Sequence, residues 1–249
     1  MATIRYTKDE LFESLKRTRL RTVVVEGGDD LEVLRDIEAR LAKMSGAVDF
    51  CVAGDKSTVL WIWEQRDQLP NSTVGFLADS DLWLFDNSRA GYPNVVFTRG
   101  YSIENICLGA QGLLDMVNAR ESAQIDWQHA LNGLIDWFSS ETAYYLSGAN
   151  PILDVGIQQI LETSGHFDLT PQAKARIQVA PAEFFATTRQ IIRSNPITYI
   201  RGKQLFLALA EILNKHDGFR TPLKSLRAFG SRTENPEIEN LIADLANSF

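Results

Sequence analysis

Short apolar runs alternate with amphipathic stretches over roughly the first 110 residues of the chain. Four of these runs have the length and the β-branched content of strands: 21–25, 48–52, 73–77 and 94–98. Between the first three runs, the stretches 29–43 and 56–68 carry apolar residues at helical spacing. This alternation predicts an α/β fold with a mostly parallel, Rossmann-like sheet that helices cover on both faces.

The two ends of the chain follow a helical pattern. Thr7 and Glu10 have the spacing of a capping box, which predicts a helix start before the first strand. Beyond about residue 103 only helical patterns occur, with predicted helices at 109–120, 124–147, 151–163, 182–194, 203–215 and 235–247. We therefore expect two domains, a sheet-containing domain at 1–110 and an all-helical region at 111–249 that binds a substrate or a partner.

The overall composition is that of a soluble globular protein, with 45% hydrophobic and 23% charged residues. No apolar stretch approaches the roughly 20 residues of a membrane span, and the N-terminus does not resemble a signal peptide. Cys51 and Cys107 lie in apolar surroundings without metal-ligand spacing, so we interpret them as buried, reduced thiols. These features predict a cytoplasmic protein without a membrane partner.

Two of the predicted strands end in carboxylates. Glu26 follows the run Val23-Val24-Val25, and Asp79-Ser80-Asp81 follows a later strand 53 positions on (79 − 26). Ligands of open α/β sheets bind at the carboxyl ends of strands, so Glu26, Asp79 and Asp81 are expected around one cleft. Three oxygen ligands without His or Cys suit Mg²⁺ or Mn²⁺, which indicates chemistry on phosphates.

Each of these carboxylates also has a plainer interpretation. Glu26 could be a turn residue before the next helix, and acids such as Asp29 and Asp30 favour helix N-termini. Asp79 and Asp81 fit an Asx-turn. The D-x-D pattern also occurs in haloacid-dehalogenase phosphatases, whose further Thr and Lys motifs we cannot trace in this chain.

Four ordered motifs resemble those of one enzyme family. Glu26-Gly27-Gly28-Asp29-Asp30 and Asp79-Ser80-Asp81 are similar to the two marks of the TOPRIM fold of topoisomerases, bacterial primases and overcoming-lysogenization-defect nucleases. Tyr101-Ser102-Ile103-Glu104-Asn105-Ile106 and Arg201-Gly202-Lys203 resemble the "IEN" and "GK" motifs of the TOPRIM-like DUF4435 family. The best-known members of that family are nuclease effector subunits of the PARIS anti-phage defence system. The similarity covers residues 20 to about 110 well and the helical remainder loosely.

The resemblance implies roles for individual residues. Glu26 would act as a general acid or base or share a metal ion, and Asp79 and Asp81 would hold Mg²⁺ or Mn²⁺. Glu104 could complete a second metal site, although a plain helix-start Glu explains it nearly as well. Asp30 is a further candidate near the metal.

The resemblance also implies an activity and a partner. The expected protein is a metal-dependent endonuclease, a toxic effector that cleaves RNA such as transfer RNA and that an ABC-type ATPase partner keeps silent until infection. DNA cleavage, as in the overcoming-lysogenization-defect nucleases, is the alternative. A second alternative is a TOPRIM-like binding module whose main task is to dock to the ATPase. The sequence leaves open whether the active form is a homodimer.

The charge is unevenly distributed. The chain carries a net −7, but the segment 174–232 has 11 Lys or Arg against three acids, a local balance of +8. Such asymmetry is a hint of nucleic-acid contact, although ordinary solvated helix faces explain it equally well. Within and beyond this segment the candidate phosphate contacts are Lys56, Arg189, Arg193 and Lys203. Lys56 starts a helix after Asp55, where a helix-cap interpretation is equally good.

Overall fold

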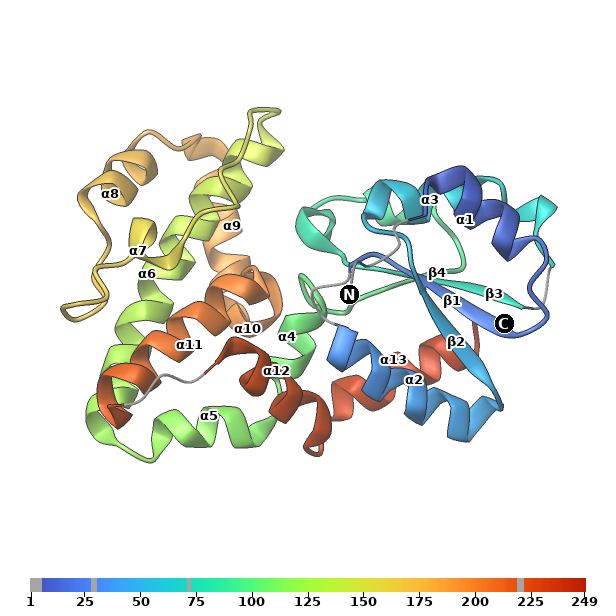
Figure 1. Ribbon diagram of the computed structural model, residues 1–249. Coiled ribbons are helices and arrows are strands. Elements are labelled where there is room, and N and C mark those ends of the chain that lie inside the picture. Colours follow the sequence, from blue (N-terminus) through green and yellow to red (C-terminus); the bar gives the residue numbers. More distant parts are fainter. Residues whose placement is uncertain (1–5, 28–30, 71–72, 219–221) are drawn as a thin grey trace. The chain divides into compact units, whose positions relative to one another are not determined.

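The computed structural model describes residues 6–27, 31–70, 73–218 and 222–249 (Figure 1). The chain forms two compact units. Unit 1 consists of Met1–Ser80, Arg89–Thr98 and Pro236–Phe249, and unit 2 consists of Asp81–Ser88 and Arg99–Asn235. The chain therefore passes between the units several times.

Unit 1 is built on a four-stranded sheet in which every neighbouring pair is parallel. Its strands are β1 (Arg21–Val25), β2 (Val48–Val52), β3 (Val74–Ala78) and β4 (Val95–Phe97), in the spatial order β2-β1-β3-β4. Val25, the last residue of β1, pairs with Val52 on one side and with Leu77 on the other. This confirms the predicted α/β class with a parallel sheet, and the predicted bounds of the first two strands.

Helices cover both faces of this sheet, as Figure 1 shows. The helices α1 (Lys8–Leu15) and α3 (Lys56–Glu64) pack on one face, and α2 (Leu31–Ser45) and α13 (Pro236–Ala246) pack on the other. From β1 the chain passes through α2 to β2, at the edge of the sheet. From β2 it passes through α3 to β3, on the other side of β1. Because crossovers between parallel strands are right-handed, the two connecting helices must lie on opposite faces.

Local signals explain why several of these elements begin where they do. The capping box predicted at the first helix is present: the backbone N–H of Glu10 donates to Thr7 Oγ1 at 3.3 Å, and Glu10 Oε2 accepts from the Thr7 N–H at 2.8 Å. Gly75 has no side chain where the C-terminal residues cross β3. A Cβ there would lie 2.9 Å from the Oγ of Ser248, so the glycine permits this close packing.

Unit 2 is helical. Its elements are α4 (Ile103–Leu108), α5 (Gln111–Asn118), α6 (Glu121–Leu146), α7 (Ile157–Ile160), α8 (Pro171–Gln178), α9 (Ala182–Ser194), α10 (Pro196–Tyr199), α11 (Gly202–Asp217) and α12 (Leu223–Arg232). The long helix α6 contacts α5, α7, α8, α9 and α11, and its inward residues, such as Leu134 and Phe138, are fully buried. The predicted C-terminal helical region is therefore present.

The division of the chain differs from the expected boundary near residue 110. The last helix, α13, belongs to unit 1, where it packs on α2, β3 and β4, and Arg40 of α2 forms an ion pair with Glu239 at 2.8 Å. The segment Asp81–Ser88 belongs to unit 2, where Phe85 contacts the rings of Phe138 and Tyr199. Local sequence patterns could not predict either assignment, because both depend on contacts between distant segments.

The helical prediction was also too long in one place and incomplete in others. The helix expected at 151–163 is reduced to α7, because Leu161 leaves the helix and forms an antiparallel bridge with Leu169. The helices α8, α10 and α12 were not predicted, and α4 was anticipated only through the helix-start interpretation of Glu104. For α8 the signal was present: Thr170 caps the helix through the N–H of Ala173, and Pro171 occupies its first turn.

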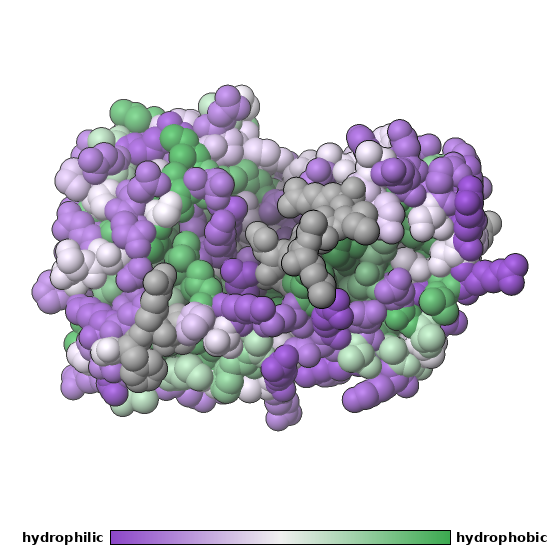
Figure 2. All heavy atoms as spheres, viewed as in Figure 1, coloured by the Kyte–Doolittle hydropathy of each residue, from purple (hydrophilic) through white to green (hydrophobic). Residues whose placement is uncertain are grey.

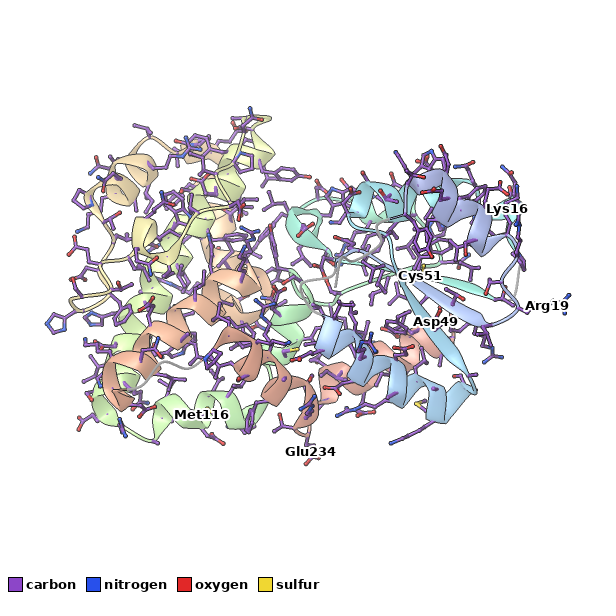
Figure 3. The ribbon with its side chains drawn as sticks, viewed as in Figure 1. Lys16, Arg19, Asp49, Cys51, Met116 and Glu234 are labelled. Atoms are coloured by element: carbon purple, nitrogen blue, oxygen red, sulfur yellow. The ribbon has the colours of Figure 1, made fainter. Side chains whose placement is uncertain are left out.

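Hydrophilic residues prevail on the face shown in Figure 2, with small hydrophobic areas among them. Among the described residues, no helix has both the length and the apolar character needed to cross a membrane. Within the described part of the chain neither cysteine forms a disulfide; Cys107 is buried as expected, whereas Cys51 on β2 is only half-buried. Burial, and the nearby charge of Asp49 on the same strand (Figure 3), raise the pKa of the Cys51 thiol to about 11.

Candidate functional site

The centre of the candidate site is the topological switch point of the sheet in unit 1. From β1 the chain moves to β2 on one side, and β3 lies on the other side of β1. Loops after two such adjacent strands diverge, which opens space at their carboxyl ends where ligands of α/β proteins bind. Glu26 is the first residue after β1, and Asp79 is the first residue after β3.

One hydrogen bond joins these two strand ends. The backbone N–H of Asp79 donates to Oε1 of Glu26 at 2.7 Å. The Glu26 side chain therefore reaches across to the end of the neighbouring strand, where a charge-assisted bond holds its carboxylate. Both residues are half-buried, so they are accessible from solvent. The structure thus brings the Glu26 carboxylate to the backbone of Asp79, so that two of the three residues that the sequence placed in one site meet.

The residue between the two aspartates is held firmly from β4. The N–H of Ser80 donates to Thr98 Oγ1 at 2.9 Å, and Ser80 Oγ donates to the carbonyl oxygen of Thr98. Arg89 Nη1 in turn donates to Ser80 Oγ at 3.3 Å. Ser80 and Thr98 are fully buried, so the end of β3 has a defined geometry.

Asp81 begins unit 2 and has an unusual backbone. Its φ is +47°, in the left-handed region, where Asp is tolerated better than most residues with a side chain. Its N–H donates to the carbonyl oxygen of Tyr101 at 2.7 Å. The left-handed turn bends the chain immediately after the strand end, and such departures from ordinary backbone geometry cluster at functional sites.

Glu104 lies on the short helix α4 in unit 2 and is almost completely buried. Ser102 Oγ donates to Glu104 Oε2 at 2.6 Å, and the next residue, Asn105, donates through Nδ2 to the carbonyl oxygens of Ile197 and Ile200. Glu104 therefore lies in the first turn of a helix, as its plainer interpretation predicted, and its carboxylate has a polar partner in the residue that caps this helix.

The two further motifs of the resemblance meet within unit 2. A Cβ on Gly202 would lie 2.7 Å from Glu104 Cβ and 2.7 Å from Asn105 Oδ1. Glycine at this position is thus explained by the close approach of α11 to α4. The flanking cations, Arg201 and Lys203, form ion pairs with Asp154 at 3.3 and 3.7 Å.

Lys56 is the first residue of α3 and is half-buried. The preceding Asp55 caps the helix: its Oδ1 accepts from the Thr58 N–H at 2.7 Å and from Ser57 Oγ at 2.6 Å. These hydrogen bonds from Ser57 and Thr58 hold the pKa of Asp55 below its usual range. Because a carboxylate already takes the Thr58 amide, the structure favours the helix-cap interpretation over a phosphate cradle at this helix start.

The basic segment of the sequence is partly neutralised by the fold. At least five of its cations pair with acids from residues 126–154: Arg176 with Glu141, Arg189 with Asp136, Arg201 and Lys203 with Asp154, and Lys215 with Asp126. The count of +8 therefore overstates the positive surface. Arg193 on α9 and Lys174 on α8 are exposed and are the clearest remaining candidates for phosphate contact.

The residues present fit one hydrated hard cation. Asp30 lies outside the described residues, and among those described no group of three or more His, Cys, Asp or Glu side chains is arranged to hold a metal ion. Mg²⁺ takes one or two protein carboxylates and fills its other positions with water and substrate oxygens. Glu26 and Asp79, at adjoining strand ends without a His or Cys beside them in the sequence, match that donor set.

Two contributors to this site were not recognised in the sequence, Ser80 and Thr98. Their position could have indicated them, because Thr98 follows β4 just as Glu26 follows β1 and Asp79 follows β3.

No model of a known protein family matches the chain, and no curated protein matches it either.

Proposed function

We propose that this chain is a Mg²⁺- or Mn²⁺-dependent endonuclease of the TOPRIM type that hydrolyses phosphodiester bonds at the carboxyl ends of β1 and β3. The observation that carries the proposal is the 2.7 Å hydrogen bond from the Asp79 N–H to Glu26 Oε1 at the switch point of a parallel sheet. It supports a single site built from the two carboxylate motifs of the sequence.

Each residue has a distinct role in this proposal. Asp79, with Asp81 two residues on, holds the metal ion, and Glu26 transfers a proton or shares the metal. When bound, the ion neutralises the negative charge that develops on the phosphate. The bond from the Asp79 amide fixes the direction of the Glu26 carboxylate, and fixed orientation of an acid or base is a large part of its catalytic effect. Glu104 is proposed for a second metal ion.

The wider biological proposal follows from the resemblance. The substrate is RNA such as transfer RNA, with DNA as the alternative, and the protein acts in the cytoplasm as the toxic effector of an anti-phage defence pair with an ABC-type ATPase. The contact between α4 and Gly202 supports this interpretation, because it makes the two downstream motifs parts of one structural feature.

Metal binding and cleavage test the proposal together. Thermal melts of the wild type with and without Mn²⁺ should differ by about 5 °C at a hundredfold excess over Kd. Asp79→Asn should abolish that difference, and Asp49→Asn, an exposed aspartate on β2, is the matched control that should retain it. Purified protein should cleave transfer RNA or duplex DNA with Mg²⁺ and stop when EDTA is added.

Two results would refute the proposal. The first is a melt that Mn²⁺ leaves unchanged in the wild type. The second is metal-dependent cleavage that persists undiminished in Asp79→Asn, since the site would then lie elsewhere. Comparing transfer RNA with duplex DNA under the same conditions decides between the two substrate classes.

A further inference from the structure

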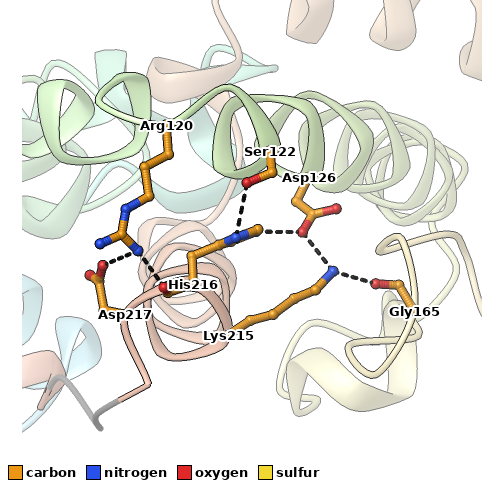
Figure 4. A network of polar contacts seen from close by, with 7 residues as sticks. All are labelled: Arg120, Ser122, Asp126, Gly165, Lys215, His216 and Asp217. Atoms are coloured by element: carbon orange, nitrogen blue, oxygen red, sulfur yellow. Dashed lines mark hydrogen bonds and ion pairs between the residues drawn. The ribbon is translucent and has the colours of Figure 1, made fainter.

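A serine, a histidine and an aspartate form a continuous hydrogen-bonded chain in unit 2, shown in Figure 4. Ser122 Oγ lies 3.2 Å from Nδ1 of His216, and Nε2 of the same ring lies 2.8 Å from Oδ2 of Asp126. Ser122 and Asp126 are one helical turn apart on α6, and His216 is in the last turn of α11. His216 is 94 positions from Ser122 and 90 from Asp126 in the sequence, so no local sequence motif contains the three residues.

The carboxylate determines which nitrogen of His216 carries the proton. An ionised Asp126 can only accept, so in the neutral imidazole Nε2 must be the donor. Nδ1 is then the acceptor, and its lone pair faces the hydroxyl of Ser122. Nucleophilic serines are activated in this way, by a base that a third group orients.

The surroundings keep Asp126 ionised. Its side chain is only 5% exposed, and Lys215 Nζ donates to the same Oδ2 at 2.7 Å. Burial alone would raise the pKa of Asp126, but the hydrogen bonds from Lys215 and His216 outweigh it and hold the pKa below the ordinary value. Lys215 also donates to the carbonyl oxygen of Gly165 at 2.8 Å, so its position is fixed from two sides.

The backbone around His216 is fixed as well. Arg120, which precedes α6, donates to the carbonyl oxygen of His216 and forms an ion pair with Asp217 at 2.6 Å. The end of α11 is therefore clamped against the start of α6. This clamp holds the imidazole between the serine and the carboxylate, which is the arrangement that proton transfer requires.

Ser122 combines solvent exposure with nearby amide donors. Its side chain is exposed, whereas that of His216 is only 15% exposed. Ser122 and Ala123 are in the first turn of α6, and among the described residues their backbone N–H groups have no hydrogen-bond acceptor. Backbone amides at such a position can stabilise an oxyanion.

We propose that Ser122, His216 and Asp126 form a nucleophilic site that hydrolyses small carboxylic esters. Ser122 Oγ attacks the carbonyl carbon while its proton passes to Nδ1 of His216. The tetrahedral intermediate expels the alcohol, which takes that proton, and an acyl-serine remains. Water then attacks the acyl-serine, His216 again relays the proton, and the carboxylic acid leaves. Asp126 orients the imidazole and stabilises its charged form. Because Ser122 is exposed, a small ester can approach its Oγ directly from solvent.

This activity is independent of the proposed nuclease, because none of its residues belongs to the carboxylate site of unit 1. The probes are p-nitrophenyl acetate and a fluorophosphonate, which labels nucleophilic serines. Full-length protein should hydrolyse the ester at least about tenfold faster than Ser122→Ala, a modest share of what a general base contributes. Mass spectrometry should place the fluorophosphonate label on Ser122.

Two variants test whether the reactivity of Ser122 depends on His216 or only on exposure of the serine to solvent. His216→Gln should lose both ester hydrolysis and labelling while its far-ultraviolet circular dichroism matches the wild type. Ser147→Ala, which removes another exposed serine at the end of α6, should retain both. Equal ester hydrolysis by the wild type and Ser122→Ala, or labelling of Ser122 that persists in His216→Gln, would overturn the proposal.

Discussion

The backbone N–H of Asp79 donates a hydrogen bond to Oε1 of Glu26 at 2.7 Å, although the two residues are 53 positions apart in the sequence. Glu26 thus accepts a structural hydrogen bond and also carries a charge to the switch point of the sheet. These two contributions can be separated by substitution, because an amide oxygen replaces the acceptor without the charge.

We expect Glu26→Gln to remain as stable as the wild type within about 0.5 kcal/mol and to lose nuclease activity. Glu26→Ala should lose activity too and be less stable than Glu26→Gln by about 1 kcal/mol, because the Asp79 amide loses its acceptor. Urea unfolding and cleavage assays measure both effects. Glu64→Gln, an exposed position on α3, is the control. Retained cleavage in a folded Glu26→Gln protein would exclude Glu26 as an acid, base or ligand.

Asp81 needs a substitution that respects its backbone. Because its φ is +47°, Asp81→Ala adds a conformational cost of about 1 kcal/mol that has nothing to do with catalysis. Asp81→Asn keeps the preference for this conformation and removes the charge, so it should unfold at the same urea concentration as the wild type and lose cleavage. Asp81→Gly serves as the backbone control. If Asp81→Ala proves as stable as Asp81→Gly, the backbone argument fails.

The cations of α9 should behave differently from one another. Arg193 is exposed, whereas Arg189 pairs with Asp136 at 2.5 Å. Arg193→Glu should weaken nucleic-acid binding without changing stability, and the salt dependence of binding should decrease by about one unit of slope. Arg189→Glu places two acids together and should lower stability. Fluorescence anisotropy at several salt concentrations checks the first expectation, and unchanged affinity for RNA and DNA in Arg193→Glu would remove α9 from the substrate surface.

Gly202 should be intolerant of any side chain. A Cβ would lie 2.9 Å from the backbone nitrogen of Asn105 and 2.7 Å from Glu104 Cβ, so α4 or α11 must shift. We expect Gly202→Ala to cost about 1–3 kcal/mol, as overpacking in a core does. Gly91→Ala is the matched control, because a Cβ there meets nothing within 4 Å. Equal melting temperatures for the two variants would contradict the close approach.

Arg176 should be needed for the stability of unit 2. It donates through Nε to Oε1 of the completely buried Glu141 at 2.9 Å, and through Nη2 to Oε2 at 3.1 Å. Arg176→Ala leaves that carboxylate without its cation and should destabilise the protein by about 3 kcal/mol. Lys174→Ala, an exposed residue on the same helix, should change stability by less than about 0.5 kcal/mol. Denaturant unfolding of both variants provides the comparison.

The elements whose hydrophobic pattern depends on neighbours in the sequence were predicted well. The bounds of β1, β2 and α9 agree with the apolar runs and helical spacing that predicted them, because burial on a sheet or a helix face imposes a period of its own. The approach of Glu26 to Asp79 also followed from the sequence, since residues that end adjacent parallel strands must meet at one edge.

Contacts between distant segments were decided only by the tertiary structure. The sequence determined that residues 174–232 are basic, but the fold pairs Arg176 and Arg189 with acids of α6 and so removes much of that charge from the surface. It determined a helix at 235–247, but packing on α2 placed α13 in unit 1. Ser122, His216 and Asp126 likewise meet only because α11 ends beside the start of α6. Local periodicity reports which face of an element is buried, whereas the choice of partner depends on the packing of the whole chain.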